Sequence, residues 1–244
     1  MAASDRTKKT SARAAAEIWT GTAQLLSLLN GVAQSTVEEF AAAASTIELP
    51  PRAEIYPSGA RCTGLHVVLS GRVKLSLPVS ESAHKVIALL GPGTWFGEGA
   101  LFLRERHALS ASTIQRSALA HIPAATVLRC LNEDDSFALK MLTETSRRLR
   151  RTMLDCAAAS SPARRRVIGF LLDELASAKA SSASAEILLP AVKRVIASRL
   201  SISGEHLSRV FRELTRARLI RVDGPHVFVR SVSRLRDAYS NSSR

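Results

Sequence analysis

The spacing of apolar residues divides the chain into segments with different expected secondary structure. Residues 25–45 carry apolar side chains at every third or fourth position, which predicts one or two helices. From Ile47 to Ile122, short β-branched runs alternate with Gly and Pro, which predicts several short strands. Alternation in 67–69 and 73–77, on either side of Gly71, predicts two strands joined by a tight turn. Strands at this spacing are typical of an antiparallel sandwich or roll.

Helical spacing returns after Pro123, and neither Gly nor Pro occurs from Phe137 to Cys156. Five residues of this segment lie alternately four and three positions apart, as in a coiled-coil seam: Leu142, Ser146, Leu149, Met153 and Cys156. The spacing predicts a long helix that pairs with a second copy of the chain. The alternative is an ordinary helix whose apolar side packs inside its own chain.

The last third of the chain predicts helices and one hairpin. Proline stops a helix and serine caps the next one, so Ser160-Ser161-Pro162 marks a boundary. A helix is predicted over 163–176, and a Ser- and Ala-rich loop follows over 177–185. Asp223-Gly224 lies between two alternating runs, which predicts a β-hairpin over 220–229.

Residues 195–211, VIASRLSISGEHLSRVF, match the pattern of a helix-turn-helix. The expected inward positions are Ile196, Ala197 and Leu200 in the first helix and Leu207 and Val210 in the second. Ile202 is expected to fill the corner between them, and Ser203 to cap the second helix. Ser201 stands where many such turns place Gly, because the backbone there has a positive φ.

The outward side of the second helix carries polar side chains suited to reading DNA, since the early outward residues of a recognition helix reach base edges. Arg209 has the two-pronged donor geometry for guanine, Glu205 can accept from cytosine, and Ser208 can bond either kind of edge. Three further arginines are expected at phosphates or in solvent: Arg212, Arg216 and Arg218. The alternative is a scaffold of two amphipathic helices with a solvated charged face.

The charge distribution agrees with a nucleic-acid partner. The formal net charge is +13, and residues 161–244 hold 16 Lys and Arg against 7 Asp and Glu. A localised positive field attracts a polyanion, and neutralising phosphates supplies much of the affinity for nucleic acid. By charge alone, a basic surface that only promotes solubility is the alternative.

Other function classes find no support in the sequence. Every apolar run is shorter than the roughly 18 residues that cross a bilayer, and the start lacks the apolar core of a signal peptide, so we expect a cytoplasmic protein. The three cysteines, Cys62, Cys130 and Cys156, form no CxxC pair that would indicate zinc or an iron–sulfur cluster. Neither an HxH cluster nor a catalytic triad occurs, so no enzyme, catalytic residue or metal site is expected. Residues 91–99, GPGTWFGEG, lack the ending of a P-loop and open no evident helix.

The order of these segments resembles the Crp/Fnr family over nearly the whole chain from about Leu25. Residues 56–75 (YPSGARCTGLHVVLSGRVKL) and 91–102 (GPGTWFGEGALF) resemble a cyclic-nucleotide-binding roll. Residues 213–229 (ELTRARLIRVDGPHVFV) are similar to the end of a recognition helix and its wing. The resemblance implies a regulator, either an activator or a repressor, that binds palindromic double-stranded DNA as a homodimer and contacts RNA polymerase.

The implied fold class is α+β: an N-terminal antiparallel β-roll of cyclic-nucleotide-binding type, a long dimerisation helix and a C-terminal winged helix-turn-helix. We therefore expect four segments. These are a flexible basic tail (1–22), an effector-sensing roll (23–125), a dimerisation helix (126–160) and a DNA-binding domain (161–244).

Within the family, residues 205–209 match the Glu-x-x-Ser-Arg pattern of the Fnr and Dnr branch, which implies half-sites arranged as TTGAT-N4-ATCAA. The cyclic-AMP-receptor branch usually has Arg at the position of Gly204 and Gly at that of Ser208. The expected DNA contacts are therefore Glu205, Ser208 and Arg209 on bases, with Arg212 on phosphate. A regulatory module on the same roll, without transcriptional output, is the rival reading, and it would not need the helix-turn-helix.

The resemblance leaves the effector open between a cyclic nucleotide and haem. For a nucleotide it implies Glu98 at the ribose and Thr152 near an adenine. In an alignment without gaps, His107 stands at the position of the family's phosphate-binding Arg, and Arg106 stands one residue before it. Adjacent residues of a strand point to opposite sides, so Arg106 can bind the phosphate only if the loop is shorter or bulged. For haem with nitric oxide, the candidate ligands are His66, His84, His107 and His121. No cysteine precedes Cys62, so the iron–sulfur mechanism of Fnr is not expected. Oxidation of the Cys62 thiol is a third candidate signal for the sensor domain, and the neighbouring Arg61 is expected to lower the pKa of this thiol.

Overall fold

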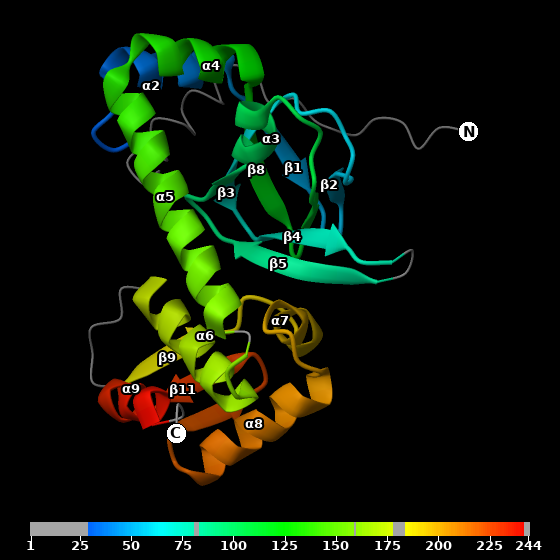
Figure 1. The fold of residues 1–244 in the computed structure, drawn as a ribbon, viewed down its shortest axis with the longest axis vertical. Helices are drawn as coiled ribbons and strands as arrows, with labels where there is room; N and C mark the ends of the chain where they lie inside the picture. The colour runs from blue at the N-terminus through cyan, green and yellow to red at the C-terminus, as the bar shows by residue number, and fades with distance from the viewer. Residues whose placement is uncertain (1–28, 81–82, 159, 178–183, 242–244) are drawn as a thin grey trace. The chain divides into compact units, whose positions relative to one another are not determined.

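The structure, a computed structural model, describes residues 29–80, 83–158, 160–177 and 184–241 (Figure 1). The chain divides into two compact units, Met1–Arg148 and Leu149–Arg244. Helix α5 (Asp135–Ala158) contributes to both units without a break. The predicted tail over 1–22 lies outside the described residues. No helix in the described ranges is long and apolar enough to span a membrane.

The first unit is an antiparallel roll of two four-stranded sheets, as the sequence predicts. In order across the sheet, the first contains β1 (Ser45–Leu49), β8 (Ser117–Pro123), β3 (Gly64–Ser70) and β6 (Trp95–Phe96). The second contains β2 (Glu54–Tyr56), β7 (Ser110–Thr113), β4 (Val73–Pro78) and β5 (His84–Leu90). Strand β1 begins at Ser45, two residues before the predicted β-region, because the helical spacing of 25–45 was extended through this residue.

Strands β3 and β4 confirm the two strands predicted on either side of Gly71, but they do not pair with each other. Strand β3 pairs with β8 and β6, whereas β4 pairs with β5 and β7, so the chain changes sheet at the turn. Gly71 has φ +84°, and a Cβ there would lie 2.4 Å from the carbonyl oxygen of Arg116. Glycine is therefore required at this turn both by the backbone conformation and by the close approach of the neighbouring strand.

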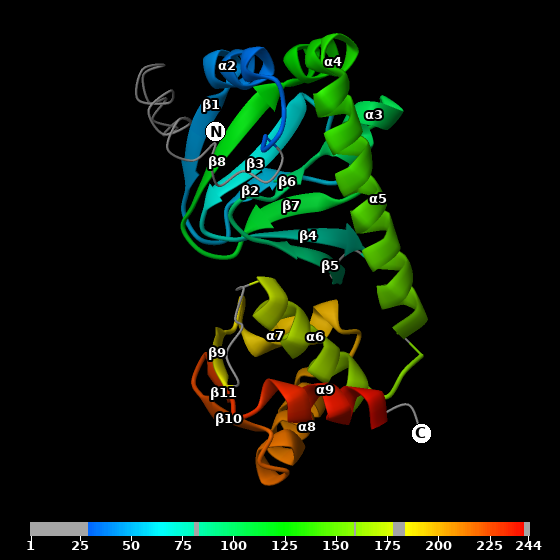
Figure 2. The ribbon, with the colours of Figure 1, turned by 90° about the vertical axis from the view of Figure 1, so that its left-hand side faces the viewer.

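Two apolar clusters hold the roll together. Between the sheets, Val68, Val73, Phe96 and Leu119 are fully buried. The outer face of the first sheet packs against helices α2 (Gln34–Ala43), α4 (Ala124–Glu133) and α5, which Figure 2 shows beside it. In this second cluster the rings of Phe40 and Phe137 meet edge to face, with centroids 5.1 Å apart. Helix α2 confirms the described part of the helical prediction over 25–45.

The predicted dimerisation segment 126–160 contains two helices, not one. Helix α4 ends at Glu133, and α5 begins at Asp135. Asp134 lies between them in an extended conformation, and its carboxylate accepts the backbone N–H groups of Ser136 and Phe137 at 2.9 and 3.1 Å. This is the N-cap arrangement, which begins a new helix rather than continuing the old one.

A short helix, α3 (Glu98–Leu103), follows the Gly-rich segment 91–97, where the sequence analysis expected none. Both residues that flank it have left-handed backbones, with φ +99° at Gly97 and +57° at Arg104. The helix has six residues, too few for the apolar repeat on which sequence prediction depends.

In the described part of the second unit, one core is surrounded by helices α6 and α9, a helix-turn-helix pair and a small sheet. In chain order its elements are α6 (Ala163–Ser177), β9 (Ala185–Leu188), α7 (Lys193–Arg199), α8 (Gly204–Arg216), β10 (Ile220–Asp223), β11 (His226–Val229) and α9 (Val232–Asn241). The hairpin β10–β11 and helix α6 confirm the predictions. Strand β9, which pairs with β11, and helix α9 were not predicted.

Candidate nucleic-acid interface and sensor site

The predicted helix-turn-helix core is confirmed. Ile196, Ala197, Leu207 and Val210 are buried, and Leu200 and Ile202 pack against the same cluster from partly exposed positions. Phe211 and Leu214 extend the buried side of α8, and this addition was missed. Their spacing from Leu207, four and seven residues, carries the helical signal that would have found them.

The turn between α7 and α8 depends on a residue that the sequence did not reveal. Ser201 has φ +55°, the left-handed conformation predicted for this position. The guanidinium of Arg166, on α6, donates to the carbonyl oxygens of Leu200 at 3.0 Å and Ser201 at 3.4 Å. Arg166 therefore fixes the two carbonyl groups that the turn withdraws from helical hydrogen bonding.

Helix α8 begins with the predicted cap. The hydroxyl of Ser203 accepts the backbone N–H of His206 at 3.1 Å, and Ser203 itself is extended. The cap fixes where the first turn of α8 starts, and hence which side chains of that turn face outward.

Replacing Ser203 with Ala is expected to lower the free energy of unfolding of the second unit by about 1 kcal/mol, because one N–H at the helix start loses its acceptor. Ser203→Asp should retain wild-type stability, since a carboxylate is an equally good cap. Urea denaturation followed by the circular dichroism of the helices measures both variants. Equal stability of Ser203→Ala and wild type would show that the cap contributes nothing.

The outer side of α8 presents the predicted reading residues. Glu205, Arg209 and Arg212 are exposed, and within the described ranges none of the three forms an ion pair. Ser208 is half-buried, and its hydroxyl donates to the carbonyl oxygen of Gly204 at 2.9 Å, which leaves its lone pairs available. The four side chains recur at helical spacing, so they share one face.

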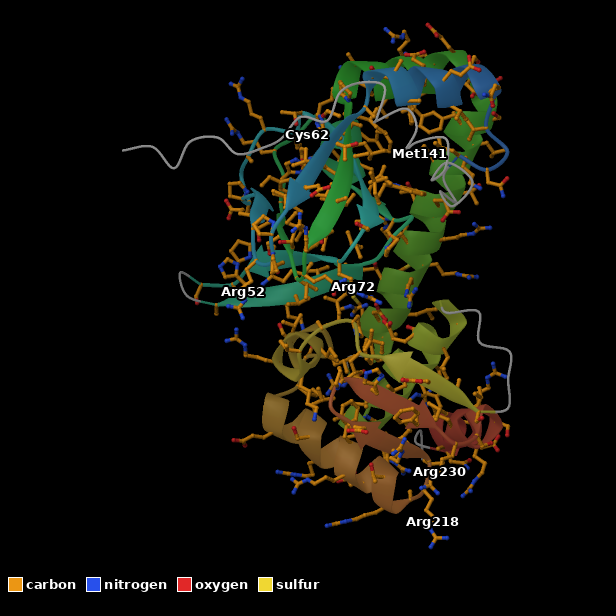
Figure 3. All side chains as sticks on the ribbon, turned by 180° about the vertical axis from the view of Figure 1, so that it is seen from behind. Arg52, Cys62, Arg72, Met141, Arg218 and Arg230 are labelled. Atoms are coloured by element: carbon orange, nitrogen blue, oxygen red, sulfur yellow. The ribbon has the colours of Figure 1, made fainter. Side chains whose placement is uncertain are left out.

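Further exposed basic side chains lie on the wing and just after the end of α8. On the wing, the guanidinium of Arg221 stacks 4.2 Å from the ring centroid of Phe228. Arg218 and Arg230 are exposed and lie at the same end of the unit (Figure 3), where the backbone of Arg230 donates to Leu219. Exposed arginines at these positions are suited to contact the phosphate backbone of DNA.

In the first unit, Glu98 is bound to a cation from α5. One terminal nitrogen of Arg148 donates to the Glu98 carboxylate, and the other donates to the carbonyl oxygen of Trp95 at 3.0 Å. Its guanidinium also lies 5.6 Å from the centroid of the Trp95 ring. Both terminal nitrogens of Arg148 are therefore engaged with the roll, and Glu98 already has a partner.

His107 lies inside the roll among aromatic rings. It is buried and stacks on Tyr56, with ring centroids 3.7 Å apart. The ring of His66 is also buried, and its centroid lies 4.8 Å from that of His121. Burial lowers the pKa of His66 to about 3, and burial also lowers the pKa of His107 and of His121. All three imidazoles are therefore neutral at physiological pH.

Arg106 points the opposite way. It is exposed, and it donates to the carbonyl oxygen of Gly59 at 2.8 Å on the outer surface. Adjacent residues of an extended segment alternate in direction, so a buried His107 requires an outward Arg106. Glu98 and His107 both lie beside Gly97, whereas Arg106 does not join them. Thr152, the fourth predicted effector residue, is exposed and belongs to the second unit.

Cys62 departs from its expected state. Its side chain is half-buried, and its thiol lies 3.5 Å from the carbonyl oxygen of Gly64. Burial raises the pKa of this thiol, although the neighbouring Arg61 was expected to lower it. A thiol with a raised pKa is less reactive toward oxidants at neutral pH, so the structure weakens the case for redox input through Cys62.

Two family profiles match the chain, one in each unit. The cyclic nucleotide-binding domain profile matches residues 46–134, and the Crp-like helix-turn-helix domain profile matches residues 165–238. Together they cover the roll and the winged domain in the expected order. The chain belongs to the Crp/Fnr family. This family consists of transcription regulators and not of enzymes.

Individual Crp/Fnr proteins resemble the chain at low identity. The CRP-like cAMP-activated global transcriptional regulator of Mycobacterium tuberculosis is 22% identical over 125 residues, which cover 51% of this chain and 56% of that protein. FixK2 from Bradyrhizobium japonicum is 22% identical, with a TM-score of 0.71 over 80% of this chain and 96% of that one. The c-di-GMP responsive regulator CLP of Xanthomonas campestris is 20% identical, with a TM-score of 0.68 over 81% and 99%. At these identities the solved structures establish the fold.

The interior of this Crp/Fnr roll does not fit a cyclic nucleotide beside Gly97. A cyclic phosphate needs a cation that faces it, but His107 is neutral, Arg106 points outward, and Arg148 is engaged with Glu98. A Cβ added to Gly97 would lie 3.1 Å from a backbone oxygen and 3.6 Å from His107, so the chain packs closely there.

The candidate haem ligands do not form a haem site either. His66 packs against Phe96, with ring centroids 5.1 Å apart, and His107 is covered by Tyr56. His121 is paired with the hydroxyl of Thr63 at 3.0 Å, and His84 is exposed on β5. Among the described residues no group of three metal-ligating side chains occurs. We therefore assign neither a nucleotide nor haem to this interior.

Proposed function

We propose that this Crp/Fnr protein is a dimeric transcription regulator that reads a TTGAT-N4-ATCAA-like palindrome with α8. One observation carries the proposal: the capped N-terminal half of α8 presents Glu205, Ser208 and Arg209 outward, while its opposite side is buried. A helix buried on one side can enter a major groove only with its exposed side, so these three side chains are the ones that meet base edges. Arg212, one turn further along, then meets phosphate.

The exposed apolar side of α5 supports the dimer. Leu142, Leu149 and Met153 are 65%, 56% and 61% exposed in the single chain, and Ser146 and Cys156 are also exposed. Leu139, 64% exposed, extends the same alternating spacing by three residues and was missed. Leucines exposed to this degree along one stripe favour burial against a second helix of the same kind. A two-fold dimer presents two copies of α8, which suits a palindrome.

The contact between Glu98 and Arg148 supports a route from sensor to output. Arg148 belongs to α5, the helix that carries the dimer stripe, and Glu98 belongs to the roll. A small effector that altered α3 would therefore act on α5 through this ion pair. As a family member the protein is also expected to contact RNA polymerase when bound upstream of a promoter.

A competition titration tests the proposal. Purified protein is added to a labelled TTGAT-N4-ATCAA duplex, with a TGTGA palindrome as the competitor, alone and with cyclic AMP or with haem plus nitric oxide. Salt-sensitive binding of two chains that prefers the first duplex supports the proposed readout. Equal, weak binding to both duplexes under every condition would contradict it. That result would favour a regulatory module without transcriptional output.

Replacing Arg209 with Ala is expected to cost about 1–3 kcal/mol of discrimination at the single guanine of each half-site, because a bidentate contact to its edge is lost. The measurement compares the affinity of each variant for TTGAT and TTAAT half-sites. Arg216→Ala, in the last turn of the same helix, is the matched control and should weaken both duplexes equally. If Arg209→Ala also weakened both equally, Arg209 would be a phosphate contact.

A further inference from the structure

An open surface pocket of about 780 Å³ lies on the roll, between α3, the start of α4 and the segment that holds Arg61 and Cys62. Three arginines line it, Arg61, Arg104 and Arg106, with one acidic residue, Glu105. Its floor is apolar and includes Leu101 of α3 and Leu128 of α4, both part of the core beneath. This pocket is separate from the interior of the roll, since Arg106 and His107 point to opposite sides.

The guanidinium groups in this pocket lack acidic partners. Among the described side chains, Arg61 and Arg104 form no hydrogen bond or ion pair, and Arg106 donates only to a backbone carbonyl. Elsewhere in the same unit, arginines such as Arg116 and Arg129 are paired with glutamates. Three like charges around one pocket, with a single acid beside them, produce a local positive potential that an anion would relieve.

The backbone holds these arginines in place. Arg61 and Arg106 face each other in an antiparallel bridge that joins two segments far apart in the sequence. Arg104 has φ +57° and ends α3, and the next backbone N–H, of Glu105, donates to Ala100 at 3.0 Å. A non-glycine residue in this conformation is disfavoured, so the surrounding structure must impose it. The backbone that carries the three arginines is therefore fixed in place.

We propose that this pocket binds a small organic anion, with a carboxylate or phosphate held by the arginines and an apolar body against Leu101 and Leu128. Guanidinium groups match the planar or tetrahedral oxygens of such anions with paired hydrogen bonds. The volume falls within the range of small-molecule sites, and an apolar floor with a few charged groups is the usual composition of such sites. The proposal stands on the roll alone and does not depend on what α8 reads.

Calorimetric titration of the full-length protein at physiological salt tests the proposal, with phenyl phosphate as the probe and phenol as its neutral counterpart. Phenyl phosphate is expected to bind and phenol is not. The double variant Arg61→Gln/Arg104→Gln should raise the Kd at least about tenfold, since each guanidinium supplies charge-assisted hydrogen bonds. Arg52→Gln is the matched control, because Arg52 is also an exposed left-handed arginine of the roll but does not line the pocket.

A second variant separates this site from the basic DNA-binding face. Arg209→Gln/Arg212→Gln should lose DNA affinity and keep the wild-type Kd for phenyl phosphate. The proposal is overturned if phenyl phosphate does not bind, or if the Arg61/Arg104 variant binds it as well as wild type. The proposal would also be overturned if Arg52→Gln or Arg209→Gln/Arg212→Gln raised the Kd for phenyl phosphate as much as the Arg61/Arg104 variant does. The probe would then respond to the overall charge of the protein. Thermal denaturation of each variant checks that the fold is retained.

Discussion

A chain with Glu in place of both Leu149 and Met153 is expected to be monomeric and to bind the palindrome roughly a hundredfold or more weakly. Both side chains are more than half exposed in the single chain and lie on the alternating stripe of α5. In a two-fold dimer each substitution would place a carboxylate against apolar side chains and near its own copy. An unpaired charge in such a position costs several kcal/mol. Light scattering measures the mass in solution, and a duplex titration measures the affinity.

Leu154→Glu is the matched control for this prediction. Leu154 is also exposed, at 63%, and is adjacent to Met153, but it lies off the alternating spacing. The control should remain dimeric and retain its affinity. If light scattering still gave the mass of a dimer for the double variant, the interface would have to lie elsewhere. A Leu154 variant that dissociates equally would show that any charge on this helix disrupts the dimer.

Replacing Asp134 with Ala is expected to lower the free energy of unfolding of the first unit by about 2–4 kcal/mol. The carboxylate accepts the hydroxyl of Thr36 at 2.7 Å, the hydroxyl of Ser136, and backbone N–H groups of Ala33 and Phe137. It therefore joins the start of α2 to the start of α5, and Ala would leave these donors without an acceptor. Urea denaturation followed by tryptophan fluorescence reports this unit, because both tryptophans, Trp19 and Trp95, precede Arg148.

The same carboxylate predicts a dependence on pH. Burial opposes the charge of Asp134, but hydrogen bonds from Ser136, Thr36 and the backbone outweigh it and lower its pKa from 3.8 to about 2. A lowered pKa stabilises the folded state by about 2 kcal/mol above pH 4, and this contribution is lost as the pH falls from 4 to 2. Asp134→Asn should lose stability at neutral pH and approach wild type near pH 2. A constant difference between them would show that the charge is not responsible.

Sequence spacing predicted the parts of this protein whose pattern is local. Leu207 and Val210 could be assigned to the buried side of α8 because helical periodicity acts within a few residues. Ser203 could be assigned as a cap for the same reason, since its partner is only three residues away. The alternation around Gly71 likewise gave two strands and a turn.

Features that depend on distant partners could not be predicted. The alternation in β3 and β4 gave the strands but not the change of sheet, which is decided by pairing with β8 and β7. Arg148 and Arg166 look like ordinary polar residues in the sequence, and their partners lie 34 or more positions away. The contacts of Asp134 with Ser136 and Phe137 are local, but its hydrogen bond with Thr36 spans 98 positions. Strand alternation predicted that Arg106 and His107 point to opposite sides, but which of the two faces the interior depends on the pairing with the distant Arg61.

The three thiols differ enough in exposure to give the chain a chemical handle of its own. Cys130 is buried, and burial, with Glu39 nearby, raises the pKa of its thiol to about 11, while Cys62 is half-buried. Cys156 is exposed at the end of α5. A maleimide dye should therefore attach first to Cys156 in a separated chain, because reagents reach exposed thiols faster than buried ones. In the proposed dimer Cys156 lies on the α5 stripe, so the second chain should protect it. The rate at which the dye attaches to Cys156 would then report how often the two chains separate, without any engineered cysteine.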